Sequence, residues 1–203
     1  MPTIDPADLA PRETYFLLTS LVVPRPIAWV STLAETGVAN LAPHSYYNII
    51  SSHPPIVHFT SSGVKDTLRN VRATGEFVVN VVSRDLLEAM NATAANFPSG
   101  EDEAAWAGLD TLPSDTVGPR RLAAARAALE CRLREELVMG NGTMVFGDVL
   151  RVHVADEVWR DGRVAPDLLQ PVGRLSGSGY TLVDEIIHLA RPSWDDLRDA
   201  PGG

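Results

Sequence analysis

Residues 61–67 combine the groups that bind a phosphate. The run reads Ser-Ser-Gly-Val-Lys-Asp-Thr, and it leads from the end of an expected strand into the start of an expected helix. Such a turn offers hydroxyls, free backbone N–H groups and the positive end of a helix dipole. Lys65, the single lysine among 17 basic residues, adds a compact charge with three donors. On these residues alone, a plain helix capped by Asp66 or Thr67 is an equally good interpretation.

A second run, residues 40–48, gathers an imidazole, two phenols, a hydroxyl and two amides within a few positions. A planar heteroaromatic ligand needs flat contacts together with a few donors and acceptors for its rim. The alternative is a polar hairpin whose aromatic side chains lie in the core, and without further observations this alternative is slightly favoured.

Catalytic motifs in which the protein itself supplies the chemistry are absent from the sequence. There is no Gly-x-Ser-x-Gly turn, no zinc-binding pattern of histidines or cysteines, and neither a dinucleotide nor a phosphate-loop fingerprint. His53 and His58 flank a Pro-Pro break, so structural roles are favoured over metal binding. Cys131 falls on the apolar side of its segment and is expected to be a core thiol. We therefore expect no protein-borne catalytic residue and no metal.

Composition sets the class of protein. A chain of 203 residues with 45% hydrophobic residues can form one domain with a sizeable core, and we expect a single domain over residues 1–203. The net charge of −9 argues against nucleic acid and anionic membranes as partners. No apolar stretch is long enough to span a membrane, no secretory signal is present, and the single cysteine favours a cytoplasmic location.

Hydrophobic periodicity and turn residues predict the elements that position these runs. Residues 122–138 fit a helix and a strand almost equally, but the Gly-Asn-Gly turn that follows favours a hairpin beginning near residue 128. Residues 97–121 form a long loop with one helical turn, typical of a lid, a binding loop or a dimer arm. Helices are expected at 8–21 (capped by Asp8), 66–74 and 85–95, and strands at 27–33, 56–61, 77–82 and 185–189. The segment 38–52 is expected to start extended, and residues 164–179 to form a loop.

An ordered set of short motifs resembles the flavin reductase-like, FMN-binding split-barrel family. The resemblance covers roughly residues 9–192, and its motifs follow one another in the family's order. They are PRPIAWVST at 24–32, GVANLAPHSYYN at 37–48, PPIV at 54–57, KDTLRN at 65–70, TGEFVVN at 74–80, NAT at 91–93, ALEC at 128–131 and PVGRL at 171–175.

The resemblance implies a mainly β fold, namely a six-stranded antiparallel split β-barrel over about residues 22–192, with peripheral helices and a polar C-terminal tail at 193–203. It further implies a homodimer with FMN near the subunit interface. Carried over position by position, the resemblance places three residues near the phosphate and ribityl chain, namely Ser31, Thr32 and Ser61, and two that hold the phosphate, Lys65 and Thr67. The isoalloxazine is then lined by Pro43, His44, Ser45, Tyr46 and Asn48. Tyr180 belongs to a segment that closes near the ring.

The function implied by this resemblance is that of a flavoprotein, an NADH- or NADPH-dependent flavin reductase in which flavin N5 accepts hydride and the protein supplies orientation and electrostatics. A partner monooxygenase would then use the reduced flavin. Two alternatives stay open: an FMN electron carrier or oxidoreductase that keeps its flavin and reduces another substrate, and a flavin-binding protein without turnover.

Overall fold

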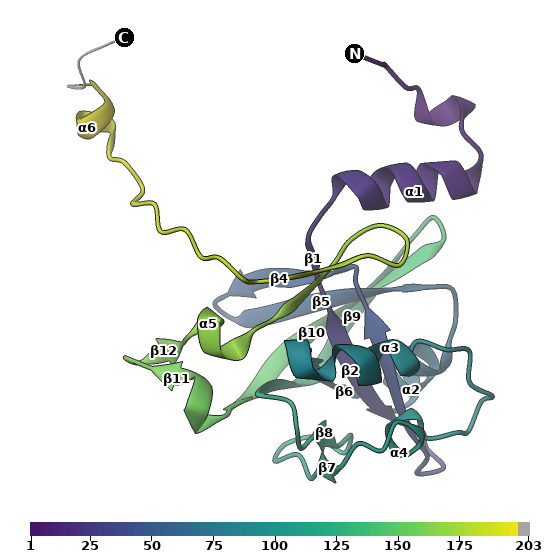
Figure 1. The fold of residues 1–203 in the computed structure, drawn as a ribbon. Helices are drawn as coiled ribbons and strands as arrows, with labels where there is room; N and C mark the ends of the chain where they lie inside the picture. Colours follow the sequence, from purple (N-terminus) through teal and green to yellow (C-terminus); the bar gives the residue numbers. More distant parts are fainter. Residues whose placement is uncertain (199–203) are drawn as a thin grey trace.

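A strongly bent antiparallel sheet forms the body of the protein in the computed structural model, which describes residues 1–198 (Figure 1). The sheet has seven strands, and every neighbouring pair is antiparallel. In spatial order these are β3 (Ala39–His44), β2 (Ala28–Leu33), β6 (Glu76–Val81), β9 (Ala127–Met139), β10 (Gly142–Val154), β5 (Pro55–Ser62) and β4 (Tyr47–Ser52).

The two edges of this sheet meet at Ser45 and Tyr46. These two residues alone connect β3 to β4, although the strands stand at opposite ends of the strand order. The Thr60 N–H of β5 donates to the Tyr46 carbonyl at 2.8 Å, which holds the corner closed. The sheet must therefore curl until its edges approach each other, as a split barrel does.

The expected count of six strands is wrong. The segment 38–52, which was expected to start extended, bends at Ser45–Tyr46 and supplies both β3 and β4. Tyr47 to Ser52 pair with β5 rather than continuing along β2. Because every neighbouring pair in the sheet is antiparallel, β3 and β4 run in the same sense, so the chain changes its partner strand without reversing, and the sequence pattern carries no sign of this change.

The main hydrophobic core fills the inside of the curl. Phe59 of β5 and Phe77 of β6 pack edge to face with their ring centroids 5.3 Å apart, and neither is exposed to solvent. Gly147 of β10 lies directly against this pair, because a Cβ atom there would come within 2.4 Å of the Phe77 ring. Only glycine allows the two strands and the aromatic ring to approach so closely.

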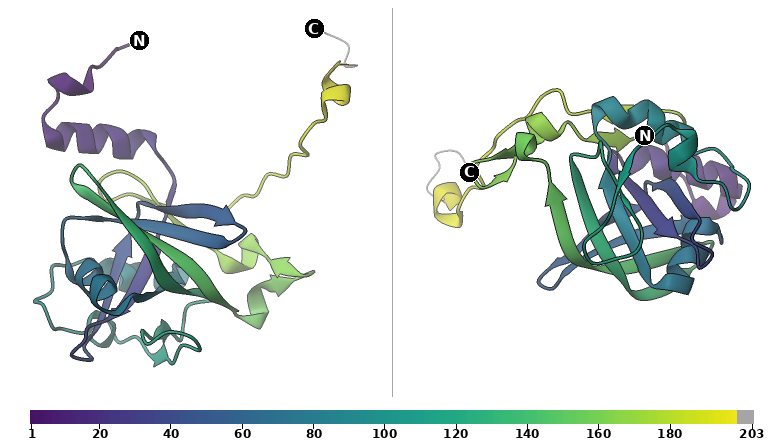
Figure 2. Two further views of the ribbon diagram at one scale, coloured as in Figure 1. Left: turned by 180° about the vertical axis from the view of Figure 1, so that it is seen from behind. Right: turned by 90° about the horizontal axis from the view of Figure 1, so that it is seen from below.

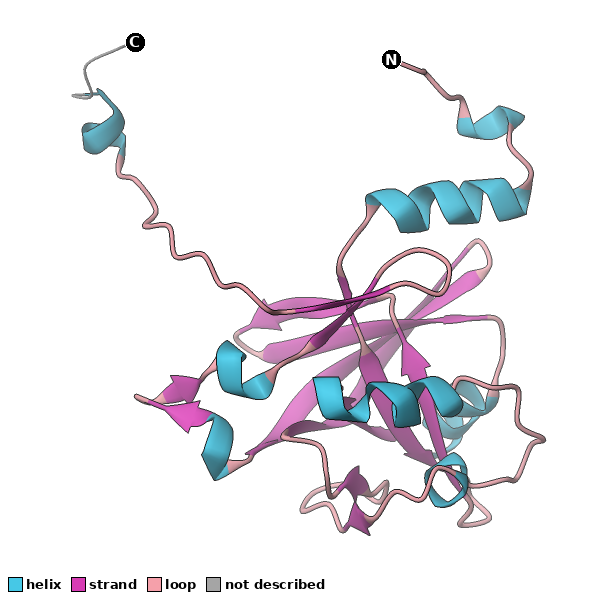
Figure 3. Ribbon diagram, viewed as in Figure 1, coloured by secondary structure: helices cyan, strands magenta, loops and turns pink. Residues whose placement is uncertain are grey.

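Helices cover the outside of the sheet and one end of it (Figures 2 and 3). α2 (Asp66–Thr74) matches the expected bounds, and Gly75 ends it in the left-handed conformation with φ of 72°. The expected helix 85–95 is shorter and begins with a 3-10 turn. The remaining helices are η1 (Pro6–Asp8), α1 (Pro11–Leu21), η2 (Arg84–Leu86), α3 (Leu87–Ala92), α4 (Glu103–Trp106), η3 (Asp156–Val158), α5 (Pro166–Leu169) and α6 (Trp194–Arg198).

The N-terminal helix and the C-terminal segment leave the body from one small sheet. β1 (Arg25–Pro26) pairs with β13 (Val172–Arg174), which pairs with β14 (Tyr180–Leu182). α1 and the chain after β14 then project to the same side of the body (Figure 1). Two shorter ribbons complete the structure: β7 (Thr111–Leu112) with β8 (Arg121–Leu122), and β11 (Trp159–Arg160) with β12 (Arg163–Val164).

Two terminal predictions need correction. The first α-helix begins at Pro11 with Ala10 as its N-cap, because Asp5 caps a separate 3-10 turn and Asp8 ends that turn. The strand expected at 185–189 is absent; residues 183–193 have no regular structure, and pairing stops with β14. The end of the expected polar tail, residues 199–203, lies outside the described residues. Within residues 1–198, no helix is long and apolar enough to cross a membrane.

Candidate functional site

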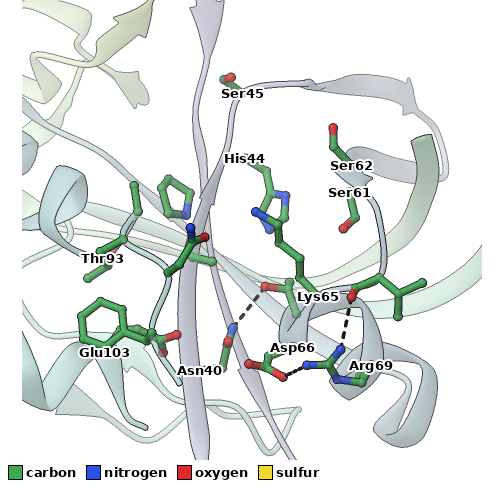
Figure 4. A pocket seen from close by; sticks show the side chains of 18 of the residues that line it. Asn40, His44, Ser45, Ser61, Ser62, Lys65, Asp66, Arg69, Thr93 and Glu103 are labelled. Atoms are coloured by element: carbon green, nitrogen blue, oxygen red, sulfur yellow. Dashed lines mark hydrogen bonds and ion pairs between the residues drawn. The ribbon is translucent and has the colours of Figure 1, made fainter. Parts of the chain in front are cut away.

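A pocket of about 420 Å³ opens between β3, the N-terminus of α2 and the loop that follows α3 (Figure 4). Its volume lies in the range that small-molecule ligands occupy in proteins. Both runs singled out in the sequence contribute to its wall. The lining residues are Tyr15, Asn40, Ala42, Pro43, His44, Ser45, Tyr46, Thr60, Ser61, Ser62, Val64, Lys65, Asp66, Thr67, Arg69, Thr93, Ala94, Ala95, Asn96, Phe97, Ser99 and Glu103.

The N-terminus of α2 forms one end of the pocket. Lys65 is the N-cap residue, with an extended backbone, and no side chain within residues 1–198 caps this end of the helix. The alternative interpretation of residues 61–67, a helix capped by Asp66 or Thr67, is therefore wrong. The first N–H groups and the positive end of the helix dipole remain available to an anion.

Lys65 directs its side chain into the pocket toward His44 (Figure 4). The carboxylate of Asp66, which would repel an anion here, is engaged by the Arg69 guanidinium and by the Ser99 hydroxyl at 3.0 Å. Thr67 is buried, and its Oγ1 accepts a hydrogen bond from the Asn40 amide at 3.1 Å. Arg69, the other cation that lines the pocket, is held by Asp66 and by the Val64 carbonyl at 3.1 Å, whereas Lys65 makes no ion pair within residues 1–198.

Ser61 shapes this end of the pocket. Its side chain is fully buried, and its hydroxyl donates to the Gly63 carbonyl at 2.8 Å. Gly63 has φ of 78°, in the left-handed region that favours glycine. Together they fold the turn between β5 and α2 so that the helix end faces the pocket.

The end of β3 and the corner after it supply the opposite wall, from Pro43 to Tyr46. His44 packs against Phe59 with ring centroids 4.7 Å apart, and its Nε2 is buried without a hydrogen-bond partner among the described residues. Burial lowers the pKa of His44 to about 4; the Thr60 backbone opposes this shift and the charge of Lys65 adds to it. His44 is thus neutral at pH 7, and the wall that Pro43 to Tyr46 form carries no charged side chain.

The neutrality of His44 can be measured. In a nuclear magnetic resonance titration of the histidine ring protons, assigned with a His44→Gln variant, we expect the His44 signal to titrate near pH 4. The cause is the loss of hydration that the imidazolium would suffer in this wall. A midpoint near the ordinary value of 6.5 would show that the ring is not buried as described.

Seven of the eleven predicted binding residues meet in this pocket, and four do not. Ser31 and Thr32 are buried in β2, where their hydroxyls accept hydrogen bonds from Asn80 at 2.9 Å and Asn70 at 3.1 Å. The exposed Asn48 bonds the Ile49 N–H beside it at 2.8 Å. The Tyr180 hydroxyl donates to Asn91 at 2.9 Å. The seven that line the pocket are Pro43, His44, Ser45, Tyr46, Ser61, Lys65 and Thr67.

The sequence reasoning missed the residues that the long loop brings to the pocket. Glu103 is buried, and its carboxylate accepts the Leu41 N–H at 2.8 Å, which fastens α4 to β3 beside the pocket. Burial raises the pKa of Glu103, while the bond from Leu41 opposes the shift. Asp102, which caps α4, was a recognisable local signal, but only the tertiary path of the loop brings residues 94–97 and Ser99 to this wall.

The family model for the flavin reductase like domain matches residues 20–166, which include β1 to β12 and the whole pocket end of α2. The chain belongs to this family. The match confirms the family resemblance seen in the ordered motifs.

Solved structures agree with this assignment over nearly the full chain. The nitrilotriacetate monooxygenase component B of Bacillus cereus is 34% identical, with a TM-score of 0.90, covering 93% of this chain and 98% of that one. The 2-nitrobenzoate 2-nitroreductase NbaA of Pseudomonas fluorescens is 33% identical, with a TM-score of 0.89 and coverage of 95% and 98%. A split-barrel protein of Shewanella frigidimarina, 21% identical with a TM-score of 0.83 and coverage of 92% and 96%, shares the fold.

Proposed function

We propose that this flavin reductase-like protein binds FMN in the pocket and uses NAD(P)H to reduce it. The observation that carries the proposal is the uncapped N-terminus of α2, with Lys65 beside it, at one end of a pocket whose opposite wall contains the rings of His44 and Tyr46 and no charged side chain. A phosphate monoester matches the first feature, and a planar ring system matches the second.

In this arrangement the backbone N–H groups at the start of α2, Lys65 and Thr67 hold the phosphate. Pro43, His44, Ser45 and Tyr46 line the ring, while Ser31 and Thr32 act indirectly, through the β2 strand that pairs with β3 along its whole length. Asn48 and Tyr180 remain proposed contacts that would require the chain around them to close over the ligand.

A bound flavin supplies the redox chemistry, because its N5 accepts hydride. The chain's own residues orient the ring and exclude water on one side. The neutral His44 places no charge of its own against the ring, and a backbone N–H, the Ser45 hydroxyl or the N–H of the neutral His44 imidazole supplies the donors at its rim. No acid or base from the protein is required for this step.

Two relatives suggest what receives the electrons. The likeness to a monooxygenase component B supports delivery of reduced flavin to a partner monooxygenase. The likeness to a 2-nitrobenzoate 2-nitroreductase supports the second candidate, an enzyme that retains FMN and reduces another substrate. The two differ in whether the flavin leaves the protein between turnovers.

An absorption experiment tests the proposal. The purified protein, with and without added FMN, is mixed anaerobically with NADH and then with NADPH. We expect the flavin absorption near 450 nm to bleach with at least one nucleotide. FMN that binds but is reduced by neither nucleotide would refute the reductase function and leave binding intact. A failure to bind FMN would refute both.

We also propose that the protein is a homodimer. α1 exposes Leu18 and Leu21 at 51% and 69%, and the segment after β14 exposes Ile187 and Leu189 at 73% and 87%. Large apolar side chains exposed in this way on two projecting segments are typical of an interaction surface. Light scattering on the same purified sample should give twice the mass of one chain.

A further inference from the structure

Arg25 carries a buried positive charge close to the pocket. Its side chain is only 6% exposed. One terminal nitrogen donates to the carbonyls of Thr19 and Val22, both at 2.7 Å, and the other donates to the Leu175 carbonyl at 2.8 Å. The first carbonyl belongs to the last turn of α1, the second to its C-cap residue, and the third lies in the turn between β13 and β14.

These bonds fasten α1 to the body. The free carbonyls at a helix C-terminus attract a cation, and the planar guanidinium can serve several of them at once. A contact between the Thr19 and Ser176 hydroxyls at 3.3 Å joins the same two segments. α1 in turn carries Tyr15, which lines the pocket. Arg25 therefore determines where this part of the pocket wall lies.

The charge of Arg25 is not neutralised by a carboxylate. Among the described residues its partners are backbone carbonyls, and its Nε has no hydrogen-bond partner at all. Most buried charges are paired, so an unpaired one in this position requires an explanation. The charge lies one helical turn from the pocket wall, because Thr19, whose carbonyl Arg25 contacts, donates its own hydroxyl to the carbonyl of Tyr15 at 2.8 Å. The charge also opposes the rise in the pKa of Tyr46 that burial and Tyr15 cause.

We propose that Arg25 is a positioning residue with two effects on the ligand pocket. It seats α1, and with it Tyr15, at the end of the pocket next to Tyr46. Its unpaired charge also makes that end favourable for negative charge, so that a flavin ring lying there is easier to reduce. The second effect rests on the proposed binding of FMN, whereas the first concerns the chain alone.

Two substitutions separate these effects. Arg25→Met removes both the charge and the donors, while Arg25→Lys keeps the charge but cannot reach three carbonyls at once. Arg126→Lys is the matched control, because Arg126 also donates to a backbone carbonyl, that of Leu168, but is paired with Asp85 and does not line the pocket. Circular dichroism checks that each variant is folded.

The readouts are hydrogen exchange of the α1 amides and the midpoint potential of bound FMN. We expect α1 to exchange at least tenfold faster in both Arg25 variants and unchanged in Arg126→Lys. In Arg25→Met the preference for reduced over oxidised flavin should fall on the order of tenfold, as for loss of a unit charge near a partly buried site; in Arg25→Lys it should stay near the wild-type value.

Unchanged α1 exchange in Arg25→Met would overturn the positioning role. A potential that is unchanged in Arg25→Met, or that falls equally in Arg25→Lys, would overturn the electrostatic role. If the wild-type protein fails to bind FMN, the proposed function and the electrostatic role fail together, while the exchange measurement still decides whether Arg25 seats α1.

Discussion

Replacing Lys65 with alanine is expected to weaken FMN binding by one to two orders of magnitude. A charge-assisted contact of this kind is worth about 1–3 kcal/mol, and the Lys65 ammonium stands at the uncapped end of α2 where the phosphate is proposed to lie. Riboflavin, which has the same ring but no phosphate, should bind the variant and the wild-type protein equally. Fluorescence quenching of each flavin on titration with protein gives both affinities.

Arg72→Ala is the control for this experiment. Arg72 lies on the same helix, but it is paired with Glu136 at 2.8 Å and does not line the pocket. Its removal changes the net charge by the same amount as Lys65→Ala. Equal losses of FMN affinity in the two variants would indicate a general electrostatic effect, and an unchanged affinity in Lys65→Ala would contradict the phosphate site.

The second large effect is expected at Glu130, a fully buried carboxylate in β9. It accepts hydrogen bonds from the backbone N–H groups of Asp115 and Thr116, both at 2.7 Å, from the Thr116 hydroxyl at 2.5 Å, and it contacts His153 Nε2 at 2.6 Å. The carboxylate thereby anchors the long loop to the sheet. Glu130→Gln turns an amide NH₂ toward these donors, and we expect a loss of about 3 kcal/mol in the free energy of unfolding.

The same residue predicts how stability depends on pH. Burial alone would raise the pKa of Glu130, but the hydrogen bonds from Thr116, Asp115 and His153 outweigh it and lower the pKa from 4.5 to about 2. Because the pKa is lower in the folded state, this stabilisation is complete above pH 4.5 and is lost as the pH falls toward 2. A shift of this size corresponds to about 3 kcal/mol.

Urea unfolding at pH 7 and at pH 3 checks both expectations. The wild-type protein should lose more stability between these pH values than Glu130→Gln does. Glu136→Gln, on the exposed part of the same strand, is the control and should cost little, because its partner Arg72 is a surface side chain. A Glu130→Gln variant as stable as the wild-type protein would contradict the anchoring role.

Local sequence signals predicted the elements that depend on local chemistry. Gly75 ends α2 because the left-handed conformation there suits glycine, and the Gly-Asn-Gly turn correctly favoured a hairpin of β9 and β10 over a helix. The extra strand β4 could not be predicted, because whether residues 47–52 stay paired with β2 or pair with another strand depends on the edge that β5 offers.

The candidate site likewise has one part that the sequence predicts and another part that it does not. Lys65 and residues 43–46 were predicted because their chemistry is concentrated in short runs. Glu103 and the loop residues after α3 were missed, because they reach the pocket only through the path of a long loop. The hydroxyls of Ser31 and Thr32 accept hydrogen bonds from the amides of Asn80 and Asn70. No spacing in the sequence reveals these two bonds.

A crystal structure of the protein with FMN tests the central claim most directly. We expect the phosphate density within hydrogen-bonding distance of the first N–H groups of α2 and of Lys65 Nζ, and the ring density against residues 43–46. Flavin density outside this pocket, or with the phosphate at the Tyr46 end and the ring at α2, would contradict the account.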